Sequence, residues 1–154
     1  MAKVKLTKTE LKAQSDALKR FQRFLPMLQL KKQQLQAEIA AISVRIEDVI
    51  ARQDAERAGV AHWHALFSEQ GYDLSTLVVV DRVVTDTSNI AGVAIPVFRE
   101  VQTTCAVLDL FQTPPWFDAA IATITRMVNL RAERAILEQQ RELVTQELDT
   151  TSQR

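Results

Sequence analysis

The fold is decided by residues 11–53, LKAQSDALKRFQRFLPMLQLKKQQLQAEIAAISVRIEDVIARQ. Steps of three and four residues from Leu11 keep returning to apolar side chains, with polar exceptions at Gln14, Lys32 and Gln53. A seam that holds its phase over six heptads is typical of a helix that supercoils against a partner helix. At 1.5 Å per residue such a helix is about 65 Å long. The apolar seam positions are Leu11, Leu18, Phe21, Leu25, Leu28, Leu35, Ile39, Ile42, Ile46 and Val49.

The ends of this first helix follow from local signals, and we place it within residues 1–58. Thr7 and Glu10 have the spacing of a capping box, which predicts a helix start at Thr7. Pro26 lies inside the seam, where we expect a bend and not a stop because the heptad phase continues on both sides. Gly59 is the expected end or weak point of the helix.

A second long helix is predicted over residues 114–154, because Thr113, Pro114 and Pro115 form a strong helix start. No glycine or proline follows to end it. If Phe117 lies beside about Arg57 in an antiparallel pair, Arg154 lies beside about Arg20, and the start of the first helix is left without a partner. The expected seam of this second helix contains Phe117, Ile121, Ile124 and Val128.

Between the helices, residues 59–113 form a connector in which we predict a β-hairpin at about 77–101. Residues 77–84 and 92–98 are rich in β-branched side chains, and residues 85–89 are polar enough for the turn. Residues 103–112 are mixed enough for one or two helical turns. Because an isolated hairpin is only marginally stable, it needs support from the helices or from another subunit. The expected fold is therefore dominated by α-helix: a long antiparallel two-helix coiled coil with a hairpin in its connector.

Charge is unevenly distributed, although the chain has no net charge. Residues 1–35 hold nine Lys or Arg side chains against Glu10 and Asp16, a net charge of +7. This basic end suits either an acidic partner surface or simple solvation of a helix face. Because it lacks an aromatic stacking platform, and because the pI is about 6.7, we do not expect nucleic-acid binding. No apolar run approaches the roughly 20 residues of a membrane span, so we expect a cytoplasmic protein without direct membrane insertion.

The sequence contains no recognisable set of catalytic or metal-binding residues. His62 and His64 lack further metal ligands, and Cys105, the single cysteine, reads as a buried small hydrophobe. The sequence contains neither a glycine-rich phosphate loop nor a nucleophile motif. We therefore expect no catalytic, cofactor-binding or metal-binding residue, and a mechanical or binding role.

Three strings carry a resemblance to a known family. LTKTEL at residues 6–11, RFLPMLQLKKQQL at residues 23–35 and NIAGVAIPVF at residues 89–98 stand in this order, and Thr150, Thr151 and Arg154 resemble the start of a TTxR motif. Together they resemble the D subunit of vacuolar-type and archaeal-type rotary ATPases. In that family the last helix continues past the motif, so the sequence is either a truncated version of a longer chain or a subunit with a shorter axle.

The resemblance implies a central-stalk rotor subunit that couples ATP hydrolysis or synthesis to ion transport, with H⁺ or Na⁺ as the ion. Implied partners are the catalytic and regulatory A and B subunits of the head, the F subunit of the stalk, and the C subunit, which links the stalk to the membrane ring. The protein would thus belong to a peripheral membrane complex through other subunits. Lys3, Lys5, Lys8 and Lys12 are the hypothetical head contacts. The hypothetical stalk contacts on the connector are Val79, Val83, Ile90, Val93, Ile95 and Val97.

Two rival functions fit a rod. A prefoldin-like chaperone also joins two long helices through hairpin material, but it oligomerises through its hairpins. A scaffold or export-apparatus coiled coil would not explain the string at residues 89–98.

Overall fold

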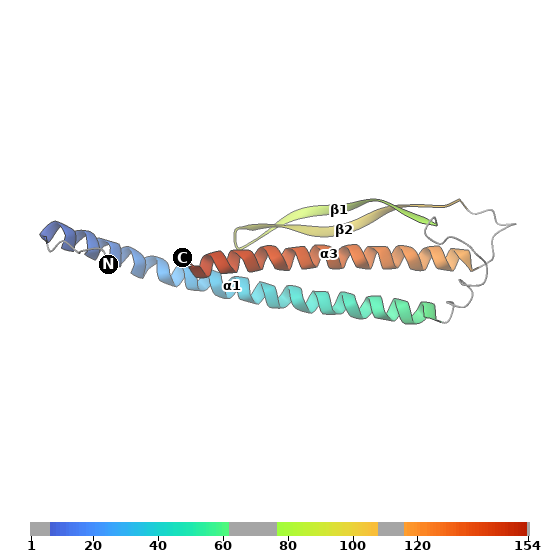
Figure 1. The fold of residues 1–154 in the computed structure, drawn as a ribbon, viewed down its shortest axis with the longest axis horizontal. Coiled ribbons are helices and arrows are strands. Elements are labelled where there is room, and N and C mark those ends of the chain that lie inside the picture. The colour runs from blue at the N-terminus through green and yellow to red at the C-terminus, as the bar shows by residue number, and fades with distance from the viewer. Residues whose placement is uncertain (1–6, 62–76, 108–115, 154) are drawn as a thin grey trace.

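The computed structural model describes residues 7–61, 77–107 and 116–153. Its elements are α1 (Lys8–Ala61), β1 (Val78–Ile90), β2 (Val93–Cys105) and α3 (Phe117–Gln153). The two helices run antiparallel, and the hairpin of β1 and β2 lies along α3 (Figure 1). Two long helices and an antiparallel hairpin between them agree with the predicted fold, and the coiled-coil geometry of the pair stays a prediction.

The 54-residue helix α1 begins and continues as its sequence indicates. The Glu10 amide donates to Thr7 Oγ1 at 3.3 Å, which satisfies one of the free N–H groups of the first turn. Pro26 lies inside α1 without ending it. Gly59 is also helical, so α1 extends to Ala61 and the expected end near residue 58 falls slightly short.

The hydrophobic core lies where α1, α3 and the hairpin meet. Leu35 and Val144 are fully buried, and Ile95 brings a hairpin side chain into the same cluster. Burying one such aliphatic side chain contributes about 1.5–3 kcal/mol, so the core accounts for both the helix pairing and the hairpin docking. The cluster comprises Leu35, Ile42, Ile46, Val49, Ile95, Leu137 and Val144.

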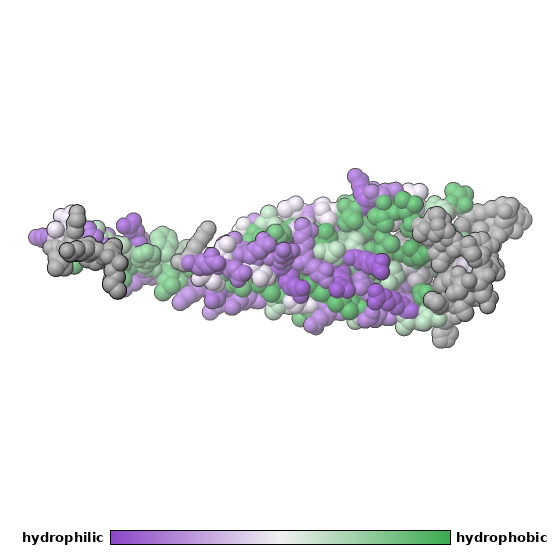
Figure 2. Space-filling model, viewed as in Figure 1, coloured by the Kyte–Doolittle hydropathy of each residue, from purple (hydrophilic) through white to green (hydrophobic). Residues whose placement is uncertain are grey.

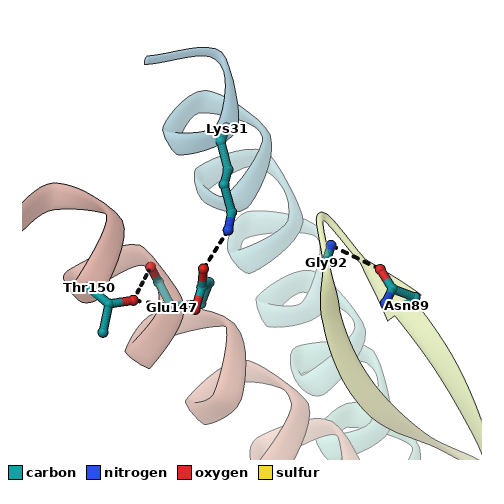
Figure 3. A network of polar contacts seen from close by, with 5 residues as sticks. All are labelled: Lys31, Asn89, Gly92, Glu147 and Thr150. Atoms are coloured by element: carbon teal, nitrogen blue, oxygen red, sulfur yellow. Dashed lines mark hydrogen bonds and ion pairs between the residues drawn. The ribbon is translucent and has the colours of Figure 1, made fainter. Parts of the chain in front are cut away.

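The hairpin differs from the predicted one in the position of its turn. Residues 85–89 belong to β1, and the turn is formed by Ala91 and Gly92, with Ile90 paired to Val93. Both turn residues have positive φ, 50° and 89°, as a two-residue type I′ turn requires. The side chain of Asn89 accepts from the Gly92 amide at 2.9 Å (Figure 3). The prediction was wrong because Thr85 and Thr87, although polar, are β-branched and favour a strand.

The second strand is also longer than predicted. Residues 103–105 pair with Val78–Val80, and Ala106 donates to the Leu77 carbonyl at 2.9 Å. The helical turns expected at 103–112 are therefore wrong for residues 103–105, where Thr103 and Thr104 have the β-branched side chains of a strand. Residues 108–112 lie outside the described residues, as do Thr113, Pro114 and Pro115.

Candidate functional site

Ion pairs between α1 and α3 show the register of the two helices. Arg126 meets Glu56 at 3.0 Å, and Lys31 pairs with Glu147 near the other end (Figure 3). The sequence estimate placed Glu147 beside about residue 27, so the actual register differs there by one helical turn. The estimate failed because it placed the end of the first helix too early. The described part of α3 therefore reaches less far along α1 than expected.

The first part of α1 extends beyond α3 and exposes its seam. Leu11 and Phe21 have 72% and 71% of their surface accessible, whereas Leu35 has none. Figure 2 shows a hydrophobic patch on this projecting helix end, with hydrophilic residues beside it. An exposed heptad stripe of this length is unusual for a surface helix and marks an interaction surface. We call its exposed seam members the α1 stripe: Leu11, Leu18, Phe21 and Leu25. Phe24, Met27 and Leu30 are further exposed apolar side chains of this helix end that lie outside the seam.

The predicted seam divides into three groups in the structure. Leu35, Ile42, Ile46, Val49 and Phe117 are buried. Leu28, Ile39, Ile121, Ile124 and Val128 are half-buried. Leu11, Leu18, Phe21 and Leu25 are exposed and belong to the α1 stripe.

The predicted contact residues are distributed over exposed and buried positions. Lys8 and Lys12 are exposed on α1, and Lys3 and Lys5 lie outside the described residues. On the hairpin, Val79 and Val83 are exposed, while Ile95 is buried in the core. Ile90, Val93 and Val97 are half-buried. Of the hairpin set, only Val79 and Val83 therefore offer a substantial surface to a partner.

Two polar side chains of α3 hold the hairpin, and sequence reasoning missed them. The Val101 amide donates to Asn129 Oδ1 at 3.1 Å, and Gln140 Nε2 donates to the Pro96 carbonyl. Gln140 is 4% exposed, so its amide is committed to this contact. Asn129 and Gln140 are three helical turns apart, and this spacing within a half-buried stripe was the available signal.

The described residues contain few side chains that are placed to support catalysis or to bind a metal ion. A cavity of about 930 Å³ lies between the end of α1 and the start of α3, but its one acidic lining residue, Glu56, is paired with Arg126. No group of three His, Cys, Asp or Glu side chains in ranges 7–61, 77–107 and 116–153 could hold a metal ion. Cys105 is exposed at the end of β2, so the expectation that it is buried was wrong. His62 and His64 lie outside the described residues.

Comparison with known proteins identifies the family of this chain. The family model of the ATP synthase D subunit matches residues 10–154, nearly the whole chain. The chain belongs to this family. The resemblance stated from the three sequence strings is thereby confirmed. The D subunit is part of the stalk and is not catalytic, which agrees with a non-enzymatic role.

Several known D subunits are similar in sequence to most of this chain. The V-type ATP synthase D subunit of Borreliella burgdorferi is 40% identical over the whole chain, which covers 76% of that relative. The subunit of the same name from Chlamydia trachomatis serovar L2 is 33% identical over 82% of the chain, and that of Chlamydia muridarum is 31% identical over a similar span. The matched part spans 64% of each of these two Chlamydia relatives. Among the described residues of this family member, no helix could cross a membrane.

Proposed function

We propose that this chain is the central-stalk rotor subunit of a V-type ATP synthase, coupling ATP hydrolysis or synthesis in the head to rotation of the membrane ring. The observation that carries this proposal is the α1 stripe. It presents apolar side chains on a basic helix end that projects beyond α3, within a family of stalk subunits. Such a surface requires a partner. Because the chain covers 76% of its Borreliella burgdorferi relative, we assign this role to a continuation of α3 in a longer chain together with the inside of the head.

The α1 stripe supports contact with the A and B subunits of the head in two ways. Its apolar side chains gain from burial at about 25 cal/mol per Å². The basic residues that flank it, including Lys8, Lys12 and Lys19, attract acidic surfaces. Lys3 and Lys5 extend the same basic end in the sequence, and we include them with Lys8 and Lys12 as head contacts.

Torque transmission is supported by the way the two helices are joined. Three ion pairs connect α1 and α3: Lys31 with Glu147, Arg52 with Glu133, and Arg126 with Glu56. Between them lies the apolar core. A packed helix pair resists bending and twisting better than a single helix does, so a conformational change against one face turns the whole pair.

In the proposed complex, the hairpin side of this chain contacts the other subunits of the stalk. We assign the F subunit, and toward the membrane ring the C subunit, as these partners. Val79 and Val83 are the exposed hairpin residues of the predicted contact set. In this arrangement the chain belongs to a membrane-associated complex through other subunits and holds no catalytic group.

Reconstitution tests the proposal with a matched pair of variants. The chain is mixed with a purified head of A and B subunits and with the F subunit, and binding and ATP hydrolysis are measured. Leu18→Asp with Leu25→Asp places two charges in the α1 stripe and should abolish binding and stimulation. Gln22→Asp with Gln29→Asp adds the same charge to exposed polar positions of the same helix and should preserve both.

A failure of the unmodified chain to bind the head would overturn the rotor assignment. Oligomerisation through the hairpin, together with suppression of aggregation of unfolded proteins, would support the prefoldin-like rival instead. Equal loss of binding in both double variants would show that added charge, and not the α1 stripe, controls assembly.

A further inference from the structure

The two outer edges of the hairpin have different surroundings. On β2, the Pro96 carbonyl accepts from Gln140, and the Val101 amide donates to Asn129. Both partners are on α3, which lies beside β2 (Figure 1). The main-chain groups that β2 turns away from β1 are therefore bonded to α3 at these two residues. Pro96 also has no N–H to leave unpaired.

The register identifies the groups that β1 turns outward. Pro96 lies opposite Thr87 and Val101 lies opposite Val83, so these two β1 residues also point their main-chain groups away from the partner strand. By alternation, Thr85 and Asn89 do the same. Among the described residues, none donates to or accepts from the outward main-chain groups of these four residues. They form a row that we call the β1 edge: Val83, Thr85, Thr87 and Asn89.

The β1 edge lacks the features that usually protect an edge strand. Residues 82–90 contain neither Lys nor Pro. The strand register shifts at two points along the hairpin. The first shift lies on β1 before Arg82, and the second, between Val84 and Thr85, adds Arg99 as an extra residue on β2. Lysine, proline and bulges are the common means by which proteins prevent an edge from pairing with another strand. The β1 edge lacks lysine and proline, and the bulge beside it places its extra residue on β2 and not on the edge strand, so this edge is competent to pair.

Charge and side-chain character indicate what the β1 edge binds. The two charged residues of this stretch are engaged within the hairpin: Arg82 donates to Gln102 at 2.8 Å, and Asp86 pairs with Arg99 at 2.5 Å. Arg82, which precedes the edge, keeps its charge because Gln102 is neutral. Asp86 is the one charged residue within 83–89, and its pairing with Arg99 leaves the β1 edge itself without an uncompensated charge. Exposed Val79, Val80 and Val83 add apolar surface beside it. An uncharged segment with β-branched side chains complements this surface, since main-chain bonds supply affinity and side chains supply selectivity.

We propose that the β1 edge binds an extended, uncharged, β-branched segment of another subunit of the ATP synthase complex, which adds to the hairpin as a third strand. The source of the segment rests on the proposed function, because a stalk subunit meets other subunits of that complex. The added strand would anchor the outer side of the hairpin while α3 anchors its inner side.

Hydrogen exchange measured on the assembled complex and on the free chain tests this proposal. The amides of the β1 edge should exchange at least about tenfold more slowly in the complex, because pairing protects them from solvent. Thr87→Pro removes one outward N–H and should return the remaining edge amides to the rates of the free chain. Ala94→Pro is the matched control, because Ala94 pairs with Asn89 and points its amide outward on β2. It should keep the protection.

The possible outcomes distinguish a failure of the third-strand proposal from a failure of the rotor assignment. A complex that contains the chain but leaves the β1 edge amides at free-chain rates would overturn the third strand, while the rotor assignment stands. Equal protection in the Thr87→Pro and Ala94→Pro complexes would also overturn it. Dimers of the free chain that dissociate on Thr87→Pro would replace the partner segment by a second copy. A chain absent from the complex would instead contradict the proposed function.

Discussion

The guanidinium of Arg52 on α1 and the carboxylate of Glu133 on α3 meet at 3.1 Å, although 81 positions separate them in the sequence. This contact, together with Arg126 and Glu56 at 3.0 Å, marks the register in which α1 and α3 lie antiparallel, while the buried core supplies most of the pairing energy. The register in turn leaves the start of α1 beyond the described part of α3. The exposed α1 stripe is a direct consequence of this register.

Exchanging the charges of this pair should test its strength. Arg52→Glu or Glu133→Arg alone should lower the free energy of unfolding, and the double exchange should recover only part of the loss, because Arg52 also pairs with Asp48 at 3.1 Å. Because the side chains are 48% and 29% exposed, the coupling should be only about 0.2–1 kcal/mol and should shrink in high salt. Denaturant unfolding of the four proteins gives the coupling. A value that is unchanged at high salt would contradict an electrostatic origin.

Core and stripe leucines should respond very differently to truncation. Leu35→Ala removes a fully buried side chain and should destabilise the chain by about 2–5 kcal/mol. Leu18→Ala removes one that is 57% exposed and should change stability by no more than about 0.5 kcal/mol in the free chain. Denaturant midpoints of both variants check this. Similar losses would mean that the stripe is covered in the free chain.

Gln53 should be a stabilising site for an apolar residue. Its side chain is 3% exposed, and its Nε2 has no hydrogen-bond partner among the described residues. Because an unsatisfied buried group costs about 1–3 kcal/mol, Gln53→Leu should raise the melting temperature. Gln36→Leu, at an exposed position of the same helix, is the control and should leave it nearly unchanged. A loss of stability in Gln53→Leu would show that the amide has a partner.

The hydrogen bond from Gln140 should hold the hairpin on α3. Gln140→Ala leaves the Pro96 carbonyl without its donor and should cost about 1–3 kcal/mol, with faster amide exchange in β2. Gln139→Ala removes the neighbouring exposed glutamine and should have little effect on either. Faster exchange confined to α3 would contradict the assigned role.

The basic end of α1 should contribute a salt-dependent part of assembly. Changing Lys3, Lys5, Lys8 and Lys12 to Gln together should weaken binding to the head more at low salt than at high salt. Changing Arg45, Arg57, Arg131 and Arg141 to Gln removes the same charge from exposed positions elsewhere and should have a smaller effect. Binding titrations at two salt concentrations check this. Equal effects of the two sets would remove the lysine contact.

Periodicity predicted the helices well because every turn of α1 and α3 repeats the same signal. The hairpin turn was misplaced because Thr85 and Thr87 are polar like turn residues and β-branched like strand residues, and only pairing resolves the two. The spacing of Asn129 and Gln140 indicated only a shared helix face; their contacts with the hairpin join residues distant in sequence, so the sequence did not identify the partner. The α1 stripe was predictable in outline, but its extent depends on the register of α3 against α1, which the periodicity of either helix alone does not determine.

Rotation of a single assembled complex tests the central claim most directly. Cys105 is the single cysteine of the chain and is exposed at the end of β2, so a bead can be attached there through its thiol. With the head fixed to a surface, the rotor account predicts that ATP drives the bead in one direction. A bead that stays fixed while the same complexes hydrolyse ATP would contradict the account.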